Sequence, residues 1–434
     1  MAYRLEGVVA LAEWIGTTEA ARRLGIKEAS LYSYVSRGLL SSRRTAGSRT
    51  SEFSAADVER LAHRGRPRAA SRGGRTAAEL VIETALTEIA DDQLRYRGID
   101  AIALASKASL EDVAQLLWTG SLPAIGQQPP WTATVEAVAI GTAAQAALPA
   151  ETMPLERLQV IVPALAAADP LRLHLDPPAV IAAGRGLVAG MVECLPPAAR
   201  PASTAGVPGG RPPSASTAAP AGGSIAERLI TRLCPEPPRD GLVDVLRATL
   251  VLLADHELAA STLAARVAAS VRADPYAVVA TGLGAVGGAL HGGASFGAET
   301  MLRSAVAPRD AQRVVGELLR RGERIPGFGH FVYQGSDPRG VFVFELLRQV
   351  APDSERLAVA EAVMAEAARR ALPAPNIDFA LAAFGAVGGM ISGAGEAIFA
   401  VARAVGWVAH ALEQYDRQGA IRPRGIYTGP SPAV

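Results

Sequence analysis

The amino-acid sequence predicts an all-α protein in two parts, a small basic module followed by a large, mildly acidic helical body. Of the 434 residues, 49% are hydrophobic and 20% are charged, which suffices for a large buried core and excludes a chain that is disordered overall. Apolar residues recur at three- and four-residue spacing along most of the chain, and the alternation typical of strands is nearly absent. Residues 1–75 carry a net charge of +7 and residues 76–434 a net charge of −6, so we expect two units with different partners.

The basic module starts with two short helical segments separated by a tight turn. Thr17–Ile26 begins with threonines that can cap a helix, and Glu28–Arg37 is a second amphipathic segment that ends at Gly38. A helix, a tight turn and a second helix form the helix-turn-helix plan, in which the second helix can enter the major groove of DNA. Residues 39–64 then predict a basic hairpin and a short helix.

The order of these segments resembles the winged helix-turn-helix of MerR-type regulators. The resemblance rests on TEAARRLGI, LYSYVSRGLL and SRR…FSAADVERL, and it assigns residues 1–65 to a DNA-binding domain. The candidate contacts to phosphate are Arg37, Arg43, Arg44 and Arg49, and the candidate contacts to bases are Ser30, Tyr32 and Ser33. The alternative is a small helical module that contacts other proteins.

Two segments have the composition of linkers. Residues 66–75 lie in a stretch of Arg, Gly and Ser, and they separate the basic module from the body. Residues 195–224 consist of Pro, Ala, Gly, Ser and Thr with almost no bulky apolar side chain, so we expect this segment to be disordered. Composition alone does not decide whether it divides two domains or forms an insertion within one.

The body, residues 76–434, reads as helical almost throughout. The clearest helical spacing is found in Leu155–Ala168, Leu242–Ala254, Val314–Arg321, Leu357–Ala371 and Ala397–Gln414. Prolines are expected to interrupt or bound these runs, namely Pro163, Pro275, Pro326 and Pro373.

The sequence favours a cytoplasmic protein that does not associate with a membrane. No uninterrupted apolar run reaches the ~20 residues of a membrane-spanning helix, and Phe379–Gly395, the nearest approach, is interpreted as one or two core helices. Glu6 and Glu13 stand where a signal peptide would be apolar. Cys194 and Cys234 are too few for a disulfide framework.

Three of the six histidines occur in unusual local sequences: His256 in ADHELAAST, His291 in GALHGGAS and His330 in GFGHFVYQGSDPRG. Two of them are flanked by glycines, where a backbone can approach a ligand closely. No HExxH motif, no paired cysteines and no GxSxG motif occur, so we expect neither a metal site nor a serine hydrolase. Gly282–Gly287 matches GxGxxG, but no convincing strand precedes it, and tight helix packing explains these glycines better.

Seven segments, taken in order, resemble the citrate synthases. They are LRYRGIDAIALASKASLEDVAQLLWTGSLP, ADHELAAST, GALHGGAS, GFGHFVYQGSDPRG, PNIDF, FAVARAVGWVAHALEQ and IRPRGIYTG. The resemblance covers residues 76–434, with residues 195–224 as an insertion, and it implies a large and a small helical domain. It also implies an acyltransferase that condenses acetyl-CoA, or another short acyl-CoA, with oxaloacetate and hydrolyses citryl-CoA to citrate and CoA. Such an enzyme has no permanently bound cofactor, and CoA is part of its co-substrate.

This chemistry needs a base at the thioester methyl group, a donor at the thioester oxygen and a donor at the ketone that is attacked. By resemblance, Asp378 is the base, His291 is the donor to the thioester oxygen, and His330 polarises the ketone of oxaloacetate. Oxaloacetate is a dianion, so cationic groups must hold it. The residues that the resemblance assigns to this role are His256, Arg339, Arg403 and, donated by the partner subunit of a homodimer, Arg422.

The sequence departs from the family pattern beside the predicted base. The family usually reads HGGAN and NVDFYSG, whereas this chain reads HGGAS and NIDFALAAFG. The altered wall could admit a propionyl group, as in 2-methylcitrate synthases. A second reading is a transcriptional regulator that uses the synthase body as a metabolite sensor, although a sensor has no need of Asp378. Structural alternatives are an ion pair on a helix face for Arg403 and a surface charge for Arg422.

Overall fold

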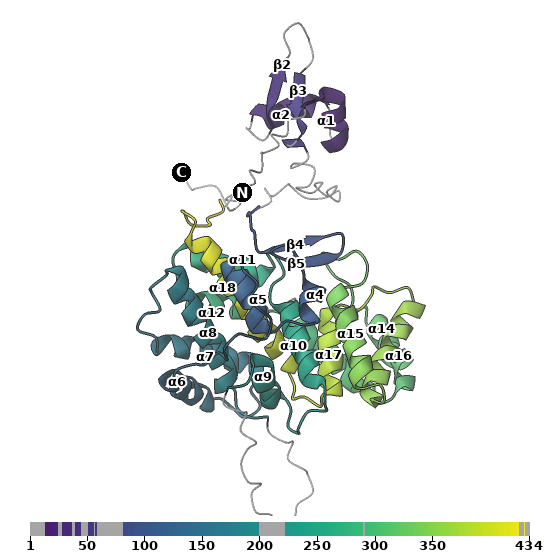
Figure 1. Ribbon diagram of the computed structural model, residues 1–434. Helices are drawn as coiled ribbons and strands as arrows, with labels where there is room; N and C mark the ends of the chain where they lie inside the picture. The colour runs from purple at the N-terminus through teal and green to yellow at the C-terminus, as the bar shows by residue number, and fades with distance from the viewer. Residues whose placement is uncertain are drawn as a thin grey trace, which may run out of the picture. The chain divides into compact units, whose positions relative to one another are not determined.

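The computed structural model describes residues 14–24, 28–36, 40–44, 51–55, 57–58, 81–198, 222–289, 291–424 and 429. The chain forms two compact units, Met1–Val81 and Ile82–Val434, and each is described by itself (Figure 1). The predicted linker at residues 66–75 lies outside the described residues. So do residues 199–221, which make up most of the predicted insertion.

The N-terminal unit contains a three-stranded antiparallel sheet and two helices. Its elements are β1 (Trp14–Gly16), α1 (Thr17–Leu24), α2 (Glu28–Ser36), β2 (Ser42–Arg44) and β3 (Ser51–Ser54), and the strand order is β1-β3-β2. The two helices and the β2–β3 hairpin agree with the predicted winged helix-turn-helix. Strand β1 was not predicted, because three residues are too few to show alternation. Leu31 and Phe53 are fully buried in the small core between the helices and the sheet.

The large unit is built mainly of helices, as predicted. They are α4 (Ala101–Ala105), α5 (Leu110–Thr119), α6 (Val135–Ala146), α7 (Pro154–Ala167), α8 (Pro177–Cys194), α9 (Ile225–Leu233), α10 (Leu242–Leu253), α11 (Ala260–Ser270), α12 (Pro275–Val286), α13 (Gly293–Ser304), the short 3-10 helix η1 (Pro308–Asp310), α14 (Ala311–Arg320), α15 (Pro338–Val350), α16 (Glu355–Arg369), α17 (Ile377–Val387) and α18 (Ala394–Tyr415). The bounds of the five predicted helices lie within three residues of α7, α10, α14, α16 and α18. Figure 1 shows α14–α17 gathered on one side of this unit and α6, α7, α8 and α12 on the other.

One expected helix interruption is wrong. Pro163 lies inside α7 instead of ending it. Its side chain is exposed, so the carbonyl that loses its helical hydrogen bond can be satisfied by solvent. Pro275, in contrast, is the first residue of α12, where a proline costs no hydrogen bond.

The large unit also holds a small sheet that the sequence did not predict. Its antiparallel strands are β4 (Thr87–Ala90), β5 (Gln93–Tyr96) and β6 (Ile99–Asp100). None of them exceeds four residues, which is too short for a reliable alternating pattern. Asp91 and Asp92 form the two-residue turn between β4 and β5, and both have positive φ, as a type I′ turn requires.

Helix α18 is the central core helix of the large unit. By length and composition it could cross a membrane, but 94% of its apolar window is buried inside the protein. Gly282 of α12 packs against it, because a Cβ atom at this glycine would lie 2.5 Å from the ring of Trp407. Close helix packing therefore explains the first glycine of the GxGxxG match, Gly282, whereas a Cβ atom at Gly284 would meet nothing within 4 Å.

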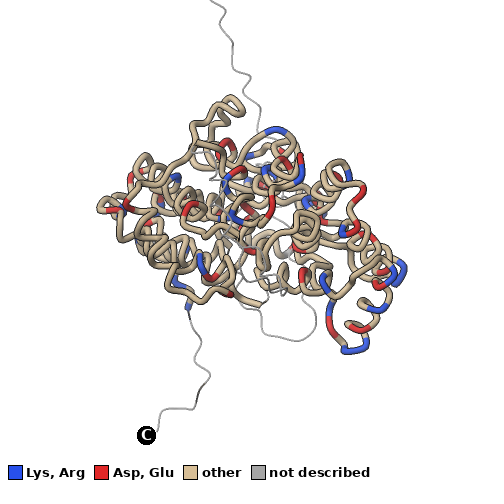
Figure 2. Tube along the Cα trace, turned by 90° about the horizontal axis from the view of Figure 1, so that it is seen from below, with Lys and Arg blue, Asp and Glu red and all other residues tan. Residues whose placement is uncertain are grey.

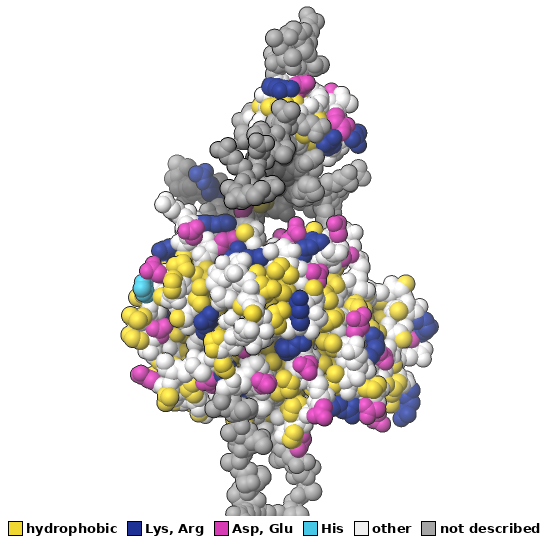
Figure 3. Space-filling view, viewed as in Figure 1, with side chains coloured by type: hydrophobic (Ala, Val, Ile, Leu, Met, Phe, Trp, Pro, Cys, Tyr) yellow, Lys and Arg dark blue, Asp and Glu magenta, His cyan; other side chains and the backbone are white. Residues whose placement is uncertain are grey.

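The surface of the large unit is of mixed charge. Basic and acidic residues alternate around its edge when it is viewed from below (Figure 2). On the face drawn in Figure 3, side chains of both signs are interspersed with apolar ones.

Candidate active site

The two backbone segments that lead to His330 and Asp378 run antiparallel and are hydrogen-bonded to each other. Asn376 N donates to Gly327 O (2.9 Å), and Gly329 N donates to Ala374 O (2.7 Å). Gly327 has a φ of +78°, and a Cβ atom there would lie 2.7 Å from Cβ of Phe379. Only glycine allows this approach, so the motifs GFGH and PNIDF are joined as one structural unit.

Asn376 is the cap that starts α17 and thereby places Asp378. Its Oδ1 accepts from Asp378 N (2.9 Å), and its Nδ2 donates to Gly329 O (2.8 Å). The Asp378 carboxylate is half-buried in the first turn of the helix, and no side-chain hydrogen bond to it occurs within the described residues. Burial raises the pKa of Asp378 to about 6, against the opposing effect of Arg339. A carboxylate without a partner and with a raised pKa is suited to act as a base.

His256, His330 and Tyr333 form an aromatic cluster next to Arg339. His256 Nε2 lies 3.0 Å from the Tyr333 hydroxyl, and the centroids of the His256 and His330 rings are 5.3 Å apart. The guanidinium of Arg339 lies 5.5 Å from the centre of the Tyr333 ring. Burial and the nearby Arg339 lower the pKa of His256 well below its ordinary value, so His256 is a neutral group at neutral pH.

The backbone fixes the tautomer of His330. Its Nδ1 accepts from Val332 N (3.0 Å) and Tyr333 N (3.3 Å), so the proton of the neutral ring lies on Nε2. Nε2 is 3.4 Å from Arg339 Nη2, which is itself a donor, and it therefore stays available to donate to a bound oxygen. Burial and Arg339 lower the pKa of His330 to about 4, so the ring is a neutral donor at neutral pH.

Asp337 aligns Arg339 and the start of α17 together. Its Oδ1 accepts from Arg339 N (3.1 Å) and Arg339 Nε (3.0 Å). Its Oδ2 accepts from Arg339 Nη2 (2.8 Å) and from Ile377 N (3.0 Å). Burial alone would lower the pKa of Arg339, but the ion pair with Asp337 raises it above its ordinary value. Arg339 is therefore a fixed cation whose orientation is coupled to the helix that carries Asp378.

Arg403 is a buried cation with free donors. Its Nε donates to Leu253 O (2.8 Å), and its guanidinium lies 4.6 Å from the centre of the Phe399 ring. Burial lowers the pKa of Arg403 to about 10, and no carboxylate forms an ion pair with it in the described part of the chain. The alternative of an ion pair on a helix face is therefore wrong. The terminal nitrogens can bind an incoming carboxylate in a bidentate manner.

His291 lies just before α13 and contacts α11 and α18. Its Nε2 is 2.9 Å from Ser261 Oγ, and its ring meets the edge of the Phe399 ring at 5.6 Å between centroids. A neutral ring that accepts from Ser261 at Nε2 carries its proton on Nδ1. Burial and Arg403 lower the pKa of His291 to about 4, so the ring is neutral under ordinary conditions.

Six of the seven predicted substrate-site residues thus fall into three linked groups. His256, His330 and Arg339 contact one another directly or through Tyr333, and Asp378 is joined to them through Asn376 and Asp337. His291 and Arg403 both contact Phe399. In addition to burial and Arg339, the charge of Arg403 lowers the pKa of His256, and it opposes the rise that burial causes in the pKa of Asp378. The exception is Arg422, which is exposed beyond the end of α18 and makes no contact with the other six within this chain.

Four further residues of the site were not predicted, although they lie in the family motifs: Ser261, Tyr333, Asp337 and Asn376. The signal for the last two was available, because Asp or Asn directly before a helical run is typical of an N-cap.

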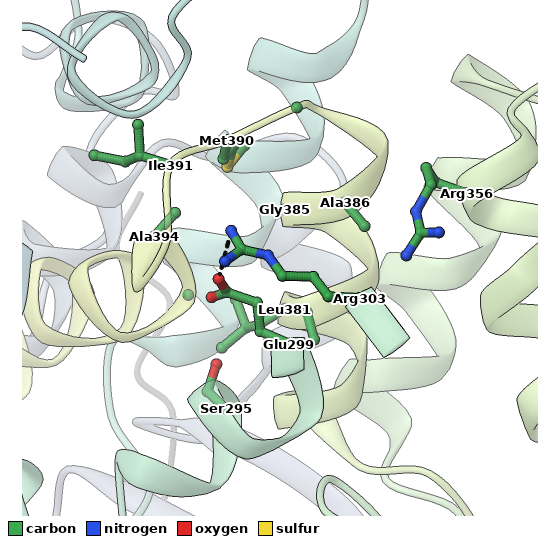
Figure 4. A pocket seen from close by; sticks show the side chains of 13 residues that line it. Ser295, Glu299, Arg303, Arg356, Leu381, Gly385, Ala386, Met390, Ile391 and Ala394 are labelled. Carbon is green, nitrogen blue, oxygen red and sulfur yellow. Dashed lines mark ion pairs between the residues drawn. The ribbon is translucent and has the colours of Figure 1, made fainter. Parts of the chain in front are cut away.

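A cavity of about 300 Å³ lies one helical turn beyond His291 and Asp378 (Figure 4). Ser295 of α13 and Leu381 of α17 line it, and these two positions are among those that depart from the family pattern. At one side of the cavity Arg303 pairs with Glu299 at 2.9 Å, which the dashed line in Figure 4 marks. At the two altered positions the cavity is therefore lined by a small polar and an apolar side chain, while Glu299, Arg303 and Arg356 line it elsewhere.

The candidate DNA contacts are only partly within the described residues. Tyr32 is 49% exposed on α2, and its ring meets the edge of the Phe53 ring. Arg43 on β2 pairs with Glu52 on β3 at 2.8 Å. Ser30 lies on α2 and Arg44 on β2. Arg37, Arg49 and the side chains of Ser33 and Arg44 lie outside the described residues.

Comparison with known proteins supports both units. The family profile described as "Citrate synthase, C-terminal domain" matches residues 76–424, and that described as "MerR HTH family regulatory protein" matches residues 17–64. The chain is 31% identical to citrate synthase 2 of Bacillus subtilis over 380 residues, which cover 80% of this chain and 93% of that protein. It is 30% identical to 2-methylcitrate synthase of Mycobacterium tuberculosis over 364 residues, or 81% and 89% of the two chains.

A solved structure of citrate synthase from Thermotoga maritima matches the fold. The TM-score is 0.64 at 25% identity, and the match covers 82% of this chain and 96% of the other. The family profile alone spans most of the chain. The chain therefore belongs to the citrate synthase family and is an enzyme of its condensing acyltransferase type.

Proposed function

We propose that the large unit condenses acetyl-CoA with oxaloacetate and hydrolyses the resulting citryl thioester to citrate and CoA. The observation that carries this proposal is the half-buried Asp378 carboxylate without a hydrogen bond, placed by the same backbone pairing that places His330. Asp378 removes a proton from the acetyl methyl group, and the Nδ1 proton of His291 stabilises the enolate oxygen that forms. The methylene carbon then attacks the ketone of oxaloacetate, whose oxygen takes a proton from Nε2 of His330.

The cationic groups bind oxaloacetate. Arg403 is supported as a carboxylate ligand by its free terminal nitrogens, and Arg339 by the ion pair that fixes its orientation. His256 contributes a neutral donor or acceptor beside His330. We place Arg422 of the partner subunit at the remaining carboxylate, which requires a homodimer. The exposure of Arg422 in the single chain supports this arrangement.

The test of this function is CoA release by the purified protein with acetyl-CoA and oxaloacetate together, and with each substrate alone. Release only with both substrates supports the condensation. Propionyl-CoA is the second substrate to assay, because the cavity beside Ser295 and Leu381 favours room for a larger acyl group. A higher kcat/KM with propionyl-CoA would assign the chain to 2-methylcitrate synthesis instead.

The rate is expected to rise with pH through a single step near pH 6. Asp378 must be ionised to act as a base, and its pKa is raised to about 6, so about one tenth of the carboxyl is ionised at pH 5. His291 and His330, with pKa values of about 4, stay neutral over the whole range. We expect kcat/KM to increase about tenfold between pH 5 and pH 7. A flat profile between these values would contradict the raised pKa of Asp378.

We further propose that residues 1–65 bind DNA and that a homodimer presents two such modules. The support is the net charge of +7 of residues 1–75 and the match to the MerR profile. The alternative is a regulator that uses the large unit only as a sensor, and its only support is the match to the MerR profile. The complete set of charged site residues favours an active enzyme instead. The buried, unpaired Cys194 and Cys234 support a cytoplasmic location.

DNA affinity is expected to fall steeply with salt. Eight arginines in a dimer that contact phosphates would release about as many counterions, so affinity should drop about 10⁴-fold between roughly 50 and 200 mM salt. The measurement is an anisotropy titration of the whole chain at both salt concentrations, with a chain that starts at Thr76 as the control. Equal, weak binding by both proteins would remove the DNA-binding proposal and leave a module for protein contacts.

A further inference from the structure

The β4–β5 hairpin contacts the two loops that carry His256 and His330. The open end of the hairpin contacts the loop before α11. The turn, at its other end, contacts the loop before α15. Figure 1 shows β4 and β5 along the edge of the large unit, near α4 and α11.

The strand ends of the hairpin fix the loop that contains His256. Thr87 Oγ1 donates to Asp255 Oδ2 at 2.5 Å, and Asp255 is completely buried. The hydroxyl of Tyr96, also completely buried, lies 3.0 Å from Val251 O and 3.1 Å from Leu252 O. These bonds leave the backbone next to His256 little freedom to move.

The turn of the hairpin contacts the loop that follows His330. Asp92 Oδ1 accepts from Gln334 N (3.0 Å), and Asp92 Oδ2 accepts from Gly335 N (3.3 Å). Gln334 directly follows Tyr333, which contacts His256, and Gly335 lies two residues before Asp337. The carboxylate therefore binds the backbone between the aromatic cluster and the cap that aligns Arg339.

The turn has a strained backbone conformation at the residue that carries this carboxylate. Asp91 has a φ of +52° and Asp92 a φ of +57°, a region that residues with a Cβ atom rarely adopt. A turn of this type is most favourable with Asn followed by Gly. A glycine at position 92 would remove the strain but also the two hydrogen bonds to the loop.

We propose that Asp92 is a positioning residue for the oxaloacetate site. It holds residues 331–336 in the conformation that presents His330 and Arg339 toward His256, while Thr87 at the other end of the same hairpin holds the loop of His256. The hairpin thereby sets the spacing between the two loops. This inference rests on the proposed function, because it concerns the binding of oxaloacetate.

The test compares Asp92→Gly, Asp92→Asn and Asp91→Gly in the full chain. Asp92→Gly removes both acceptors and relieves the backbone, so the KM for oxaloacetate should rise about tenfold, an effect the size of the net contribution of one hydrogen bond, because the loop acts on the substrate only indirectly. The KM for acetyl-CoA should stay within about twofold, because the hydrogen bonds that place Asp378 and His291 go to Asn376 and Ser261 and not to residues 331–336. Asp92→Asn keeps one acceptor oxygen and should restore about half of the loss on a logarithmic scale.

Asp91→Gly is the matched control. Asp91 is exposed, has the same backbone strain, and makes no hydrogen bond to the loop among those of the described residues. It should leave both KM values unchanged and should not lower the melting temperature, because glycine relieves the backbone strain without the loss of a hydrogen bond. Equal KM values for oxaloacetate in Asp92→Gly and Asp91→Gly would overturn the inference.

Binding is measured separately from turnover so that two kinds of failure can be told apart. The rise in melting temperature on adding oxaloacetate reports binding without catalysis. A wild type that shows this rise but releases no CoA contradicts the proposed reaction only, and the smaller rise expected for Asp92→Gly still supports the inference. A wild type that neither binds oxaloacetate nor turns over contradicts both.

Discussion

Asp378→Asn is expected to lower the rate of CoA release about 10³-fold and leave the fold intact. The amide has nearly the shape of the carboxyl group but cannot take a proton from the acetyl methyl group. Oxaloacetate should bind as in the wild type, because Asp378 is not among its predicted ligands. The direct measurement is exchange of the acetyl-CoA methyl protons with solvent in the presence of oxaloacetate. Exchange at the wild-type rate would rule out Asp378 as the base.

The same substitution is expected to leave the protein at least as stable at neutral pH. Burial raises the pKa of Asp378 from 3.8 to about 6, so between these pH values the folded protein binds the proton more tightly than the unfolded chain. Stability is therefore lost as the pH rises through this window, and above it the ionised group costs about 1–3 kcal/mol. Asparagine has no such cost. Asp353→Asn, at an exposed position paired with Arg239, is the control and should change neither activity nor this pH dependence.

Arg266→Met is expected to destabilise the large unit by about 3 kcal/mol, because it removes the completely buried partner of a largely buried ion pair. Arg266 Nη1 lies 2.5 Å from Glu413 Oε2 and 2.9 Å from His410 Nδ1. Its Nη2 donates to Gln414 Oε1 (3.1 Å). Methionine fills similar space but leaves Glu413 and His410 without this donor in the core. The measurement is the free energy of unfolding in urea.

Arg369→Met is the matched control for this experiment. Arg369 also pairs with a glutamate, at 2.8 Å, but its side chain is 61% exposed. An exposed pair of this kind contributes about 0–1 kcal/mol. Equal losses of stability in the two variants would show that the buried network is no more important than a surface ion pair.

The Arg266 network also explains why Asp255 is ionised. Arg266 donates to Nδ1 of His410, so the His410 proton lies on Nε2, which is 3.2 Å from Asp255 Oδ2. Burial opposes ionisation of Asp255, but His410 and Arg403 together lower its pKa. The network therefore extends from the core to the loop of His256.

The sequence was sufficient to predict the helices with clear spacing, and the family motifs led to His256, His330 and Arg339, which the structure brings into one cluster. It was insufficient for contacts between distant segments. Thr87 and Asp255 are 168 residues apart, and Asp255 and His410 are 155 apart, so no local spacing reveals either pair. The β4–β6 sheet was missed because its strands are too short to show a pattern. The proton position on His330 depends on backbone donors that only the folded loop brings together.

Helix α18 carries contacts to several parts of the protein on one stripe. Arg403 binds Leu253 O, Trp407 packs on Gly282, His410 contacts Asp255, and Gln414 accepts from Arg266. Each residue of a helix is rotated by about 100° from the one before it. A single inserted or deleted residue early in α18 would therefore turn all later contacts away from their partners at once. We therefore expect the number of residues in α18 to be constrained, whereas the loops that connect the outer helices can gain or lose residues.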